Sequence, residues 1–335
     1  MLTIKEIAKL ANTSISSVSR VFNNSGYVKE EVRIRIQKVL DETGYRPNAL
    51  AKALHSKRSQ TIGVILPKIN STSSSDNIAG IDQYFADKGY SIILGNTNHN
   101  INKELEYLDL FSEKQVDGIV LIATELTEEH EKRIKKIGKP VVVMGQRTHD
   151  LTPCVLFDEA AAAEEITTHL AEWHHKSIAL IGVSENDVAV GVNRKKGYLN
   201  ALKKYDLALN EDLIVLGSFS VESGYQACKE LIEKRKQEPD AIFAINDNMA
   251  IGAINYLRAH GYRVPEDVSV CGVGGGTASA YYNPKITSLV YDFKESGRVS
   301  AELLHKLIEQ PDTELDNHVS YIPYHLDVRE STIKR

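Results

Sequence analysis

The chain has 335 residues, of which 42% are hydrophobic and 25% charged, and these ordinary globular values allow two or three domains with separate cores. No apolar stretch approaches the length of a membrane span, no secretory signal opens the chain, and the scattered Cys154, Cys228 and Cys271 do not suit a disulfide framework, so we expect a soluble cytoplasmic protein. Residues 1–58 carry 11 Lys and Arg against 5 Asp and Glu, a balance of +6, whereas the whole chain stands at -5 and residues 59–335 therefore at -11. A basic segment ahead of an acidic one is typical of a protein that binds phosphates at one end.

The basic segment contains three predicted helices. Thr3 and Glu6 fit a capping box, and apolar residues recur at helical spacing over about residues 4–11. Ser14 can cap a second helix, and a third is predicted over about residues 30–42. Two short helices joined by a tight turn, with a third helix behind them, form the helix-turn-helix pattern.

The second helix of this pattern is the one expected in the major groove of DNA. Arg20 can donate two parallel hydrogen bonds to a guanine, and Ile15 can pack on a thymine methyl group. Hydroxyl and amide side chains near the helix N-termini suit phosphates, which set the register. The residues expected at DNA in this segment are Thr3, Ser14, Ile15, Ser16, Ser17, Ser19, Arg20, Asn23 and Tyr27. The alternative is a small three-helix bundle that docks on the rest of the chain, with Arg20 as a solvated charge.

Four runs of residues follow one another along the first part of the chain. They are TIKEIAKLA at Thr3–Ala11, SVSRVFN at Ser17–Asn23, GYRPNALAKAL at Gly44–Leu54 and TIGVILP at Thr61–Pro67. In this order they strongly resemble the lactose/galactose repressor family of bacterial transcriptional regulators, and the resemblance continues almost to the C-terminus. It implies a DNA-binding domain at residues 1–45, a hinge helix and linker at residues 46–60, and an effector-binding and dimerisation body from residue 61 onward.

The hinge is the segment that the resemblance connects to the minor groove. Asn48 can cap a short helix over about residues 49–56. In the family this helix forms only when two copies meet on operator DNA, and a leucine from each copy wedges into a central base step, at the position of Leu54 here. Asn48, Ala51 and Leu54 are therefore expected DNA contacts. The alternative for Leu54 is a plain contact between two domains.

Replacing Leu54 with Ala tests the wedge. The change removes the side chain that would enter the base step, so we expect weaker operator binding and unchanged effector binding. A binding assay with operator DNA measures the first and calorimetry the second. Equal operator affinity of the two proteins would exclude the wedge.

From residue 61 onward, short apolar strands alternate with amphipathic helices. The predicted strands are residues 61–67, 91–97, 118–124, 140–146, 154–158, 177–183, 212–217, 241–246, 268–273 and 286–292. Helices are predicted between most of them, for example over 104–114, 159–173 and 192–204. This alternation predicts an α/β fold with parallel sheets covered by helices on both faces, and ligands at the C-terminal ends of the strands.

The resemblance also implies how the body is divided. It implies a periplasmic-binding-protein-like body with two subdomains and a small-molecule cleft between them. The first subdomain is expected over about residues 61–156 and 290–318, and the second over about 157–289 and 319–335. The same body occurs in periplasmic sugar-binding proteins, which lack a helix-turn-helix segment.

Polar side chains close to the predicted strand ends are the candidates for effector binding. The resemblance matches Arg194 to the arginine that family members use to hold a sugar hydroxyl or carboxylate, and Asn246 to a common polar contact. A hydroxyl-rich loop is predicted over residues 71–77. The expected effector residues are Lys68, Ser71, Ser73, Gln146, Asp187, Arg194, Asn246 and Gly274. The alternatives are a structural ion pair for Arg194 and a merely solvated loop after the first strand.

A glycine run suggests the charge of the effector. Many sugar-responsive members of the family have an aspartate shortly after the strand equivalent to residues 268–271, whereas this chain has Gly272–Gly276 (GVGGG). Loss of a carboxylate and exposed backbone N–H groups favour an anionic ligand. The segment Asp187–Arg194, with Tyr198 after it, resembles the trehalose repressor branch, which responds to trehalose 6-phosphate, and Lys68 lies where that branch places a phosphate-binding cation. We therefore expect a phosphorylated sugar; the alternative is that the glycines form only a flexible turn.

An enzyme is the weakest of the functional classes. The glycine run fails the dinucleotide-binding fingerprint, there is no Walker loop, and His169, His174 and His175 lack the spacing of a metal site, so we expect no cofactor and no metal. The remaining classes are a repressor induced by a metabolite, a regulator that needs a corepressor, and a sugar-binding protein without a DNA target. The predicted function is a homodimeric repressor of a carbohydrate-utilisation operon, with operator DNA and a sugar or sugar phosphate as its partners and no membrane contact.

Overall fold

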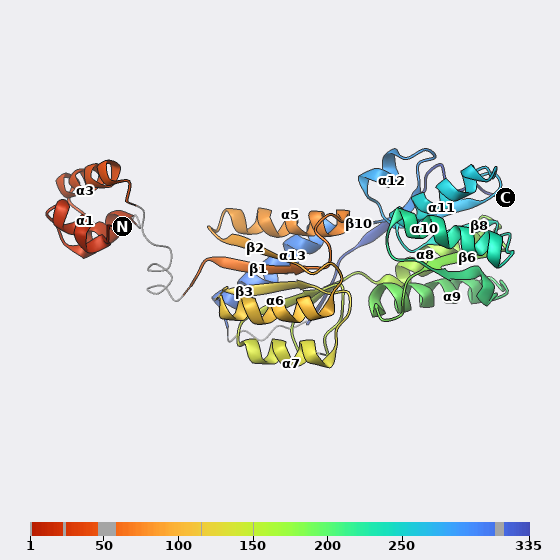
Figure 1. The fold of residues 1–335 in the computed structure, drawn as a ribbon, viewed down its shortest axis with the longest axis horizontal. Coiled ribbons are helices and arrows are strands. Elements are labelled where there is room, and N and C mark those ends of the chain that lie inside the picture. The colour runs from red at the N-terminus through yellow and green to blue at the C-terminus, as the bar shows by residue number, and fades with distance from the viewer. Residues whose placement is uncertain (1, 23–24, 46–57, 115, 150, 312–317) are drawn as a thin grey trace. The chain divides into compact units, whose positions relative to one another are not determined.

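The computed structural model describes residues 2–22, 25–45, 58–114, 116–149, 151–311 and 318–335. They belong to two compact units, residues 1–60 and residues 61–335 (Figure 1). The predicted hinge helix lies outside the described residues. None of the helices within the described ranges combines the length and the apolar character that a membrane span requires.

The described residues of the first unit form three helices, as predicted. They are α1 (Ile4–Leu10), α2 (Ile15–Phe22) and α3 (Glu30–Thr43). The Thr3 amide donates to Glu6 Oε2 at 2.7 Å and the Glu6 amide donates to Thr3 Oγ1 at 3.3 Å, so the capping box is confirmed. One apolar face of each helix meets the others in a small core formed by Ile7, Ala8, Ala11, Val18, Ile36 and Leu40.

The first sheet of the body has six parallel strands. In spatial order they are β11 (Val319–Tyr321), β5 (Cys154–Leu156), β4 (Val141–Met144), β3 (Gly118–Ile122), β1 (Thr61–Leu66) and β2 (Ser91–Asn96). Four helices cover it: α5 (Thr72–Ala86) and α13 (Phe293–Glu309) on one face, and α6 (Ile101–Glu113) and α7 (Glu128–Ile137) on the other (Figure 1). Because successive strand residues point to opposite faces, Val64 of β1 belongs to the core under α5 and α13, whereas Ile65 belongs to the core under α6 and α7.

The second sheet also has six strands, of which only the edge strand β12 is antiparallel. In spatial order they are β12 (Tyr324–Asp327), β10 (Thr287–Tyr291), β9 (Ser269–Gly274), β8 (Ala241–Ala244), β6 (Ile178–Gly182) and β7 (Ile214–Leu216). The helices around it pack as two pairs, α8 (Glu159–Glu172) with α9 (Arg194–Lys204), and α10 (Val221–Lys229) with α11 (Asp247–Ala259). Shorter elements are η1 (Val188–Asn193), η2 (Glu211–Leu213), η3 (Glu230–Lys234) and α12 (Thr277–Tyr281).

All ten predicted strands are confirmed, and two further strands were missed. β11 and β12 are only three and four residues long and lie on either side of Pro323, so neither gives a clear apolar pattern. They change the predicted subdomain boundaries, because residues 319–321 extend the first sheet and Tyr291 still belongs to the second. The chain crosses between the two subdomains after β5, after β10 and between β11 and β12.

The predicted loop over residues 71–77 is wrong. Helix α5 begins at Thr72, and Ser71 is its N-cap, whose Oγ accepts a hydrogen bond from the Ser74 amide at 3.2 Å. A run of serines favours a turn by propensity, but Ile81 and Phe85 further along α5 bury completely against the first sheet. That packing outweighs the weak preference of serine, so the polar run forms the first turns of a helix.

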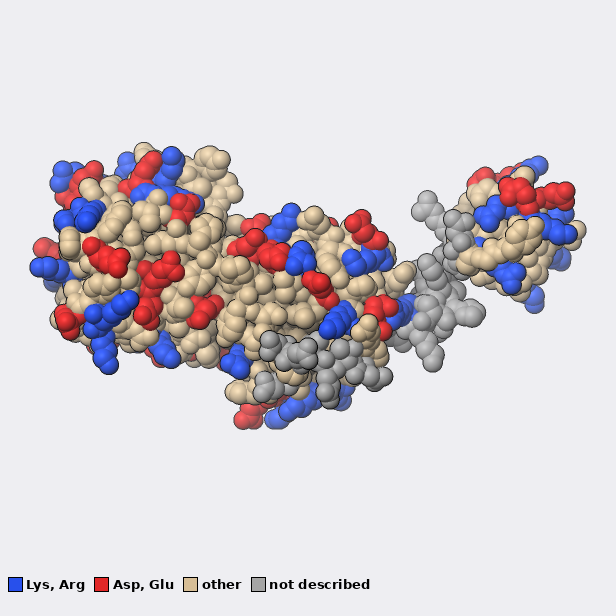
Figure 2. Space-filling model, turned by 180° about the vertical axis from the view of Figure 1, so that it is seen from behind, with Lys and Arg blue, Asp and Glu red and all other residues tan. Residues whose placement is uncertain are grey.

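The surface charge of the body is mixed. Figure 2 shows Lys and Arg side chains interspersed with Asp and Glu side chains over the body on the face in view. The acidic balance of residues 59–335 is therefore not gathered into a single patch on that face.

Candidate functional site

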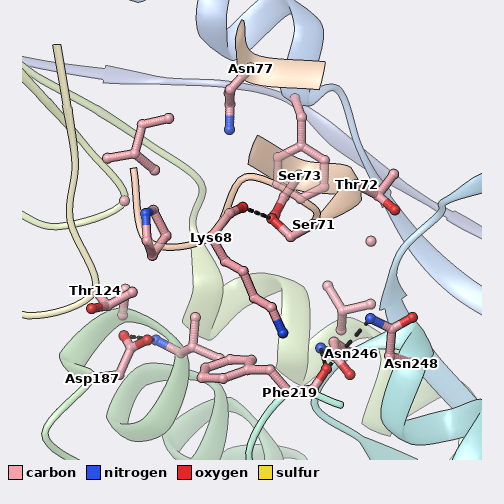
Figure 3. Close-up of a pocket in the computed structure, with 18 of the residues that line it drawn as sticks. Lys68, Ser71, Thr72, Ser73, Asn77, Thr124, Asp187, Phe219, Asn246 and Asn248 are labelled. Carbon is pink, nitrogen blue, oxygen red and sulfur yellow. Dashed lines mark hydrogen bonds between the residues drawn. The ribbon is translucent and has the colours of Figure 1, made fainter. Parts of the chain in front are cut away.

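The carboxyl ends of both sheets open into one cavity of about 460 Å³. It lies between the two subdomains, because the loops after β1 to β5 line it from one side and the loops after β6 to β9 from the other (Figure 3). The structure places all eight of the predicted effector residues in its lining: Lys68, Ser71, Ser73, Gln146, Asp187, Arg194, Asn246 and Gly274. Residues that are up to about 200 positions apart in the sequence thus share one site.

Lys68 supplies a positive charge to the cavity. Its side chain extends from the end of β1 toward Phe219 and Asn246 on the opposite wall (Figure 3). Within the described part of the chain, no Asp or Glu forms an ion pair with it. Burial lowers the pKa of His99, which lines the same cavity, and the charge of Lys68 lowers it further. The charge on Lys68 is therefore available to a bound anion.

The first turn of α5 lies beside Lys68. Ser71 and Ser73 line the cavity there, and the backbone N–H groups at the start of the helix give that end a partial positive charge. Because Ser71 Oγ is used to cap the helix, Ser73 is the freer of the two hydroxyl groups to meet a ligand.

Gln146 and Asp187 join the two subdomains at the cavity wall. Gln146 Nε2 donates to Thr124 O and to Asp187 Oδ1, both at 2.8 Å. Asp187 Oδ1 also accepts from the Val190 amide at 3.0 Å and so caps η1. Burial raises the pKa of Asp187, and the hydrogen bonds from Val190 and Gln146 oppose that rise. This pair therefore connects the end of β4 to the end of β6 without a bound ligand.

Arg194 is held by a buried ion pair, which was the structural alternative for this residue. Its Nε donates to Glu159 Oε2 at 2.6 Å, and its Nη1 donates to the Ile245 carbonyl oxygen. Tyr291 donates to the same Glu159 oxygen at 2.7 Å. Burial lowers the pKa of Arg194, but Glu159, Tyr291 and Asp187 together outweigh burial, and the pKa is raised. Among the described residues no acceptor binds Nη2, so one nitrogen of the guanidinium is left for a ligand.

The side chain of Asn246 also forms hydrogen bonds within the protein. Its Oδ1 accepts from the Met249 amide at 2.8 Å and caps α11, and its Nδ2 donates to Phe219 O at 3.0 Å. Asn246 thus fixes the loop after β7 relative to α11, and a ligand would share its amide with these partners.

The glycine run after β9 differs from the prediction. The Gly275 amide donates to Ser288 Oγ at 3.1 Å and the Gly276 amide donates to Asp247 Oδ2 at 3.1 Å, so these two N–H groups are not available to an anion. A carboxylate is also present, because buried Asp247 reaches under the run from the start of α11 and accepts from Ser279 at 2.7 Å. The prediction of free N–H groups was therefore wrong for Gly275 and Gly276. No aspartate directly follows β9, as predicted, but Asp247, which precedes the glycines by more than twenty residues, brings a carboxylate from a neighbouring strand end.

Several cavity residues were missed in the sequence. Figure 3 shows Asn77, Thr124 and Phe219 in the lining, together with predicted residues. The ring of Phe219 stacks on that of His99 across the cleft, with centroids 6.0 Å apart and planes 2° from parallel. Each of these residues except Asn77 follows a strand end, which is the signal that would have found them.

The candidate DNA contacts in and around α2 differ in their exposure. Val18 is buried in the core of the unit, whereas Arg20 and Ser16 are exposed and Ile15 is 47% exposed. Tyr27, after the helix, is 81% exposed. Of the others, Ser14, Ser16 and Ser17 share hydrogen bonds through their hydroxyl groups at the start of α2, Ser19 is half-buried, and the Thr3 side chain is used in the capping box. Asn23, Asn48, Ala51 and Leu54 lie outside the described residues.

Comparison with known proteins gives matches over almost the whole chain. The family model described as bacterial regulatory proteins, lacI family, matches residues 3–48, and a periplasmic binding protein-like domain matches residues 167–332. Catabolite control protein A of Priestia megaterium is 33% identical over 332 residues, which is 99% of each chain. The sucrose operon repressor of Staphylococcus xylosus is 33% identical over 92% of this chain and 94% of its own. The solved complex of the transcriptional regulator CelR with cellobiose matches with a TM-score of 0.75 and 29% identity, over 99% of this chain and 100% of that one.

Proposed function

Because the chain belongs to the lacI family of bacterial regulatory proteins, and is thus a DNA-binding transcriptional repressor, we propose that a sugar or sugar phosphate bound in the cavity controls its affinity for the operator of a carbohydrate-utilisation operon. The single observation that carries the choice of effector is the cavity between the two sheets, which is lined by both polar and apolar side chains, with Lys68 at its wall. Its volume of about 460 Å³ is in the range of small-molecule sites. The protein acts without catalysis, in the cytoplasm, where its operator lies.

The DNA side of the function needs two copies of the chain. Members of the family bind operator DNA as dimers, and two helix-turn-helix units on a two-fold axis read a roughly palindromic site. We place α2 in the major groove, with Ile15 and Arg20 at base edges and the hydroxyl groups around its N-terminus at phosphates. The hinge residues Asn48, Ala51 and Leu54 are proposed to enter the minor groove between the two half-sites.

Sugars are favoured by the relatives and by the residues in the cavity. One relative is named for a sucrose operon, and one solved structure is a complex with cellobiose. The cavity combines hydroxyl, amide and carboxylate groups with apolar side chains such as Phe157 and Phe293, and a sugar offers both hydroxyl edges and apolar faces. Lys68 and the N-terminus of α5 favour a phosphoryl group on that sugar. The glycine run no longer supports the phosphate, so Lys68 carries this part of the proposal.

The effector changes the affinity of the protein for its operator by binding both subdomains at once. A ligand that reaches Ser73 on one side and Asp187 or Asn246 on the other favours one arrangement of the subdomains over others. If that arrangement suits DNA less well, ligand and operator weaken each other's binding by the same factor, typically about 5–150-fold. We propose that the ligand weakens operator binding in this way, which makes it an inducer.

A DNA-binding assay tests the proposal. Labelled genomic fragments are titrated with the protein at several salt concentrations, without sugar and with trehalose, trehalose 6-phosphate, sucrose or cellobiose. We expect one fragment to be preferred, its affinity to fall as salt rises, and at least one sugar to weaken it about fivefold or more. A sugar that strengthens binding would identify a corepressor instead. No preferred fragment, or no response to any sugar, would refute the proposal.

Replacing Lys68 with Met tests the phosphate. The change removes a charge that would pair with a phosphoryl group, so we expect trehalose 6-phosphate to bind about tenfold more weakly or worse, with little change for trehalose. Calorimetry measures both affinities. Lys103→Met is the matched control, because Lys103 is an exposed lysine of α6 outside the cavity lining. Equal losses for trehalose and its phosphate would show that Lys68 does not read the phosphoryl group.

A further inference from the structure

One buried side chain in the cavity has no partner. Asn77 of α5 is only 5% exposed, and no hydrogen bond reaches its Oδ1 from any residue that the structure describes. Figure 3 shows the nitrogen of its amide directed from the helix into the cavity. Buried side-chain amides are nearly always hydrogen-bonded, so an unpaired one at a cavity wall points to a missing partner.

The position of Asn77 in the helix explains its burial. Ser73, Asn77 and Ile81 follow one another at a spacing of four, so they lie along one face of α5. Ser73 lines the cavity and Ile81 is completely buried in the core of the first subdomain. Asn77 therefore stands at the boundary where the cavity meets the core, and a polar residue there has apolar neighbours on one side.

No polar side chain that the structure describes donates to Asn77 Oδ1, although hydroxyl groups such as that of Ser73 line the same cavity. The lining on the side of the first subdomain includes Ile122, Met144 and Phe293, whose side chains neither donate nor accept hydrogen bonds of ordinary strength. The helix itself cannot shift to find a partner easily. A Cβ placed on Gly297 of α13 would lie 2.1 Å from the Asn77 carbonyl oxygen, so the two backbones are in direct contact and α5 is held in place.

We propose that Asn77 is a specificity-determining residue of the effector site, which pairs with one hydroxyl group of the bound sugar. The inference rests on the proposed function, in which a sugar or sugar phosphate fills the cavity. A hydroxyl group both donates and accepts, so it satisfies Asn77 in either orientation of the amide. The same hydroxyl would sit against the apolar lining, and the pairing would reject a sugar that lacks it, because the amide would then stay buried and unpaired.

Two variants separate this role from a structural one. Asn77→Leu replaces the amide by an apolar group of similar shape, and Asn77→Ala removes the amide without adding volume. Thr97→Val is the matched control, because Thr97 Oγ1 is also buried without a partner among the described residues, is 0% exposed, and yet is not in the cavity lining. Melting temperatures without sugar show whether each variant folds. We expect those of Asn77→Leu and Thr97→Val to equal or exceed the wild-type value, because each removes an unpaired polar group.

Calorimetry then measures sugar affinity in the four proteins. The probes are trehalose, trehalose 6-phosphate, sucrose, cellobiose and glucose 6-phosphate, followed by the monodeoxy analogues of the one that the wild type binds most tightly. We expect both Asn77 variants to bind that sugar at least about tenfold more weakly, and Thr97→Val to bind it as the wild type does. We also expect one monodeoxy analogue to bind the wild type about tenfold more weakly than the parent sugar, and to bind Asn77→Leu as well as the parent does.

The outcomes distinguish this inference from the proposed function. If a sugar binds the wild type and the Asn77 variants within about twofold of each other, Asn77 does not read the effector, and a buried water satisfies its amide. If the substitutions weaken the binding of every deoxy analogue by the same factor as the binding of the parent sugar, Asn77 acts on the shape of the site and pairs with no single hydroxyl group. Both results leave the proposed function standing. If no sugar binds the wild type, the proposed function fails and this inference fails with it.

Discussion

Replacing Arg194 with Met lowers the free energy of unfolding of the body by about 3–5 kcal/mol, because it leaves the Glu159 carboxylate buried without its cation. The two side chains are only 7% and 11% exposed, so water cannot replace the lost guanidinium effectively. The change also frees the Ile245 carbonyl oxygen, to which Arg194 donates. Urea unfolding followed by circular dichroism measures the loss.

Two controls separate the buried charge from a general effect of the substitution. Lys195 is the next residue, and its ion pair with Glu185 has the nearly equal length of 2.7 Å but side chains that are 31% and 60% exposed. Lys195→Met should therefore change the free energy of unfolding by less than about 1 kcal/mol. Adding Glu159→Gln to Arg194→Met should recover part of the loss, since no charge is then left buried. Equal effects of Arg194→Met and Lys195→Met would contradict the buried ion pair.

Replacing Arg20 with Ala should weaken binding to the preferred operator about fivefold to 150-fold, which corresponds to about 1–3 kcal/mol for a side chain that holds one guanine. Arg20 is exposed on α2, and its side chain lies beside Gly26, whose φ is 70°. Fluorescence anisotropy with the operator and with an operator changed at one guanine measures the effect. The variant should no longer distinguish the two sequences.

The control for Arg20 is another exposed arginine of the same unit. Arg35 lies on α3. We therefore expect Arg35→Ala to weaken binding to the operator and to unrelated DNA only slightly, and by the same factor. If Arg20→Ala weakened binding to both DNA sequences equally, as the loss of a phosphate contact would, α2 would not read bases through this residue.

The sequence predicts most of the body because its strands are apolar and its helices amphipathic. The buried strands β1, β3 and β4 are continuous apolar runs, which is the pattern of a parallel sheet covered on both faces. Strands β11 and β12 were not predicted because each is too short to show a periodic pattern of apolar residues. Each completes a sheet whose other strands come from earlier in the chain. Their pairing depends on tertiary contacts that no local window of sequence contains.

The sequence predicted which residues line the cavity better than it predicted the contacts that these residues make. Parallel strands put their carboxyl ends at one edge, so residues after strands could be gathered into one site from the sequence. The sequence could not show which of them are already paired. Arg194 is engaged by Glu159, and the glycine run by Asp247, through contacts between different elements. Asn77 was assigned to a loop, so its place on the buried face of a helix was hidden.

The two C-terminal strands give this fold an unusual order of assembly. The first subdomain needs α13 to cover one face of its sheet and β11 to complete the edge beside β5, yet both are made after the whole sequence of β6 to β10. During synthesis, the earlier part of this subdomain therefore leaves the ribosome with an open sheet edge and with one sheet face covered by α5 alone, until α13 and β11 follow. Loss of residues 318–335 would consequently leave each sheet of the body without one edge strand, although it removes nothing from the cavity wall.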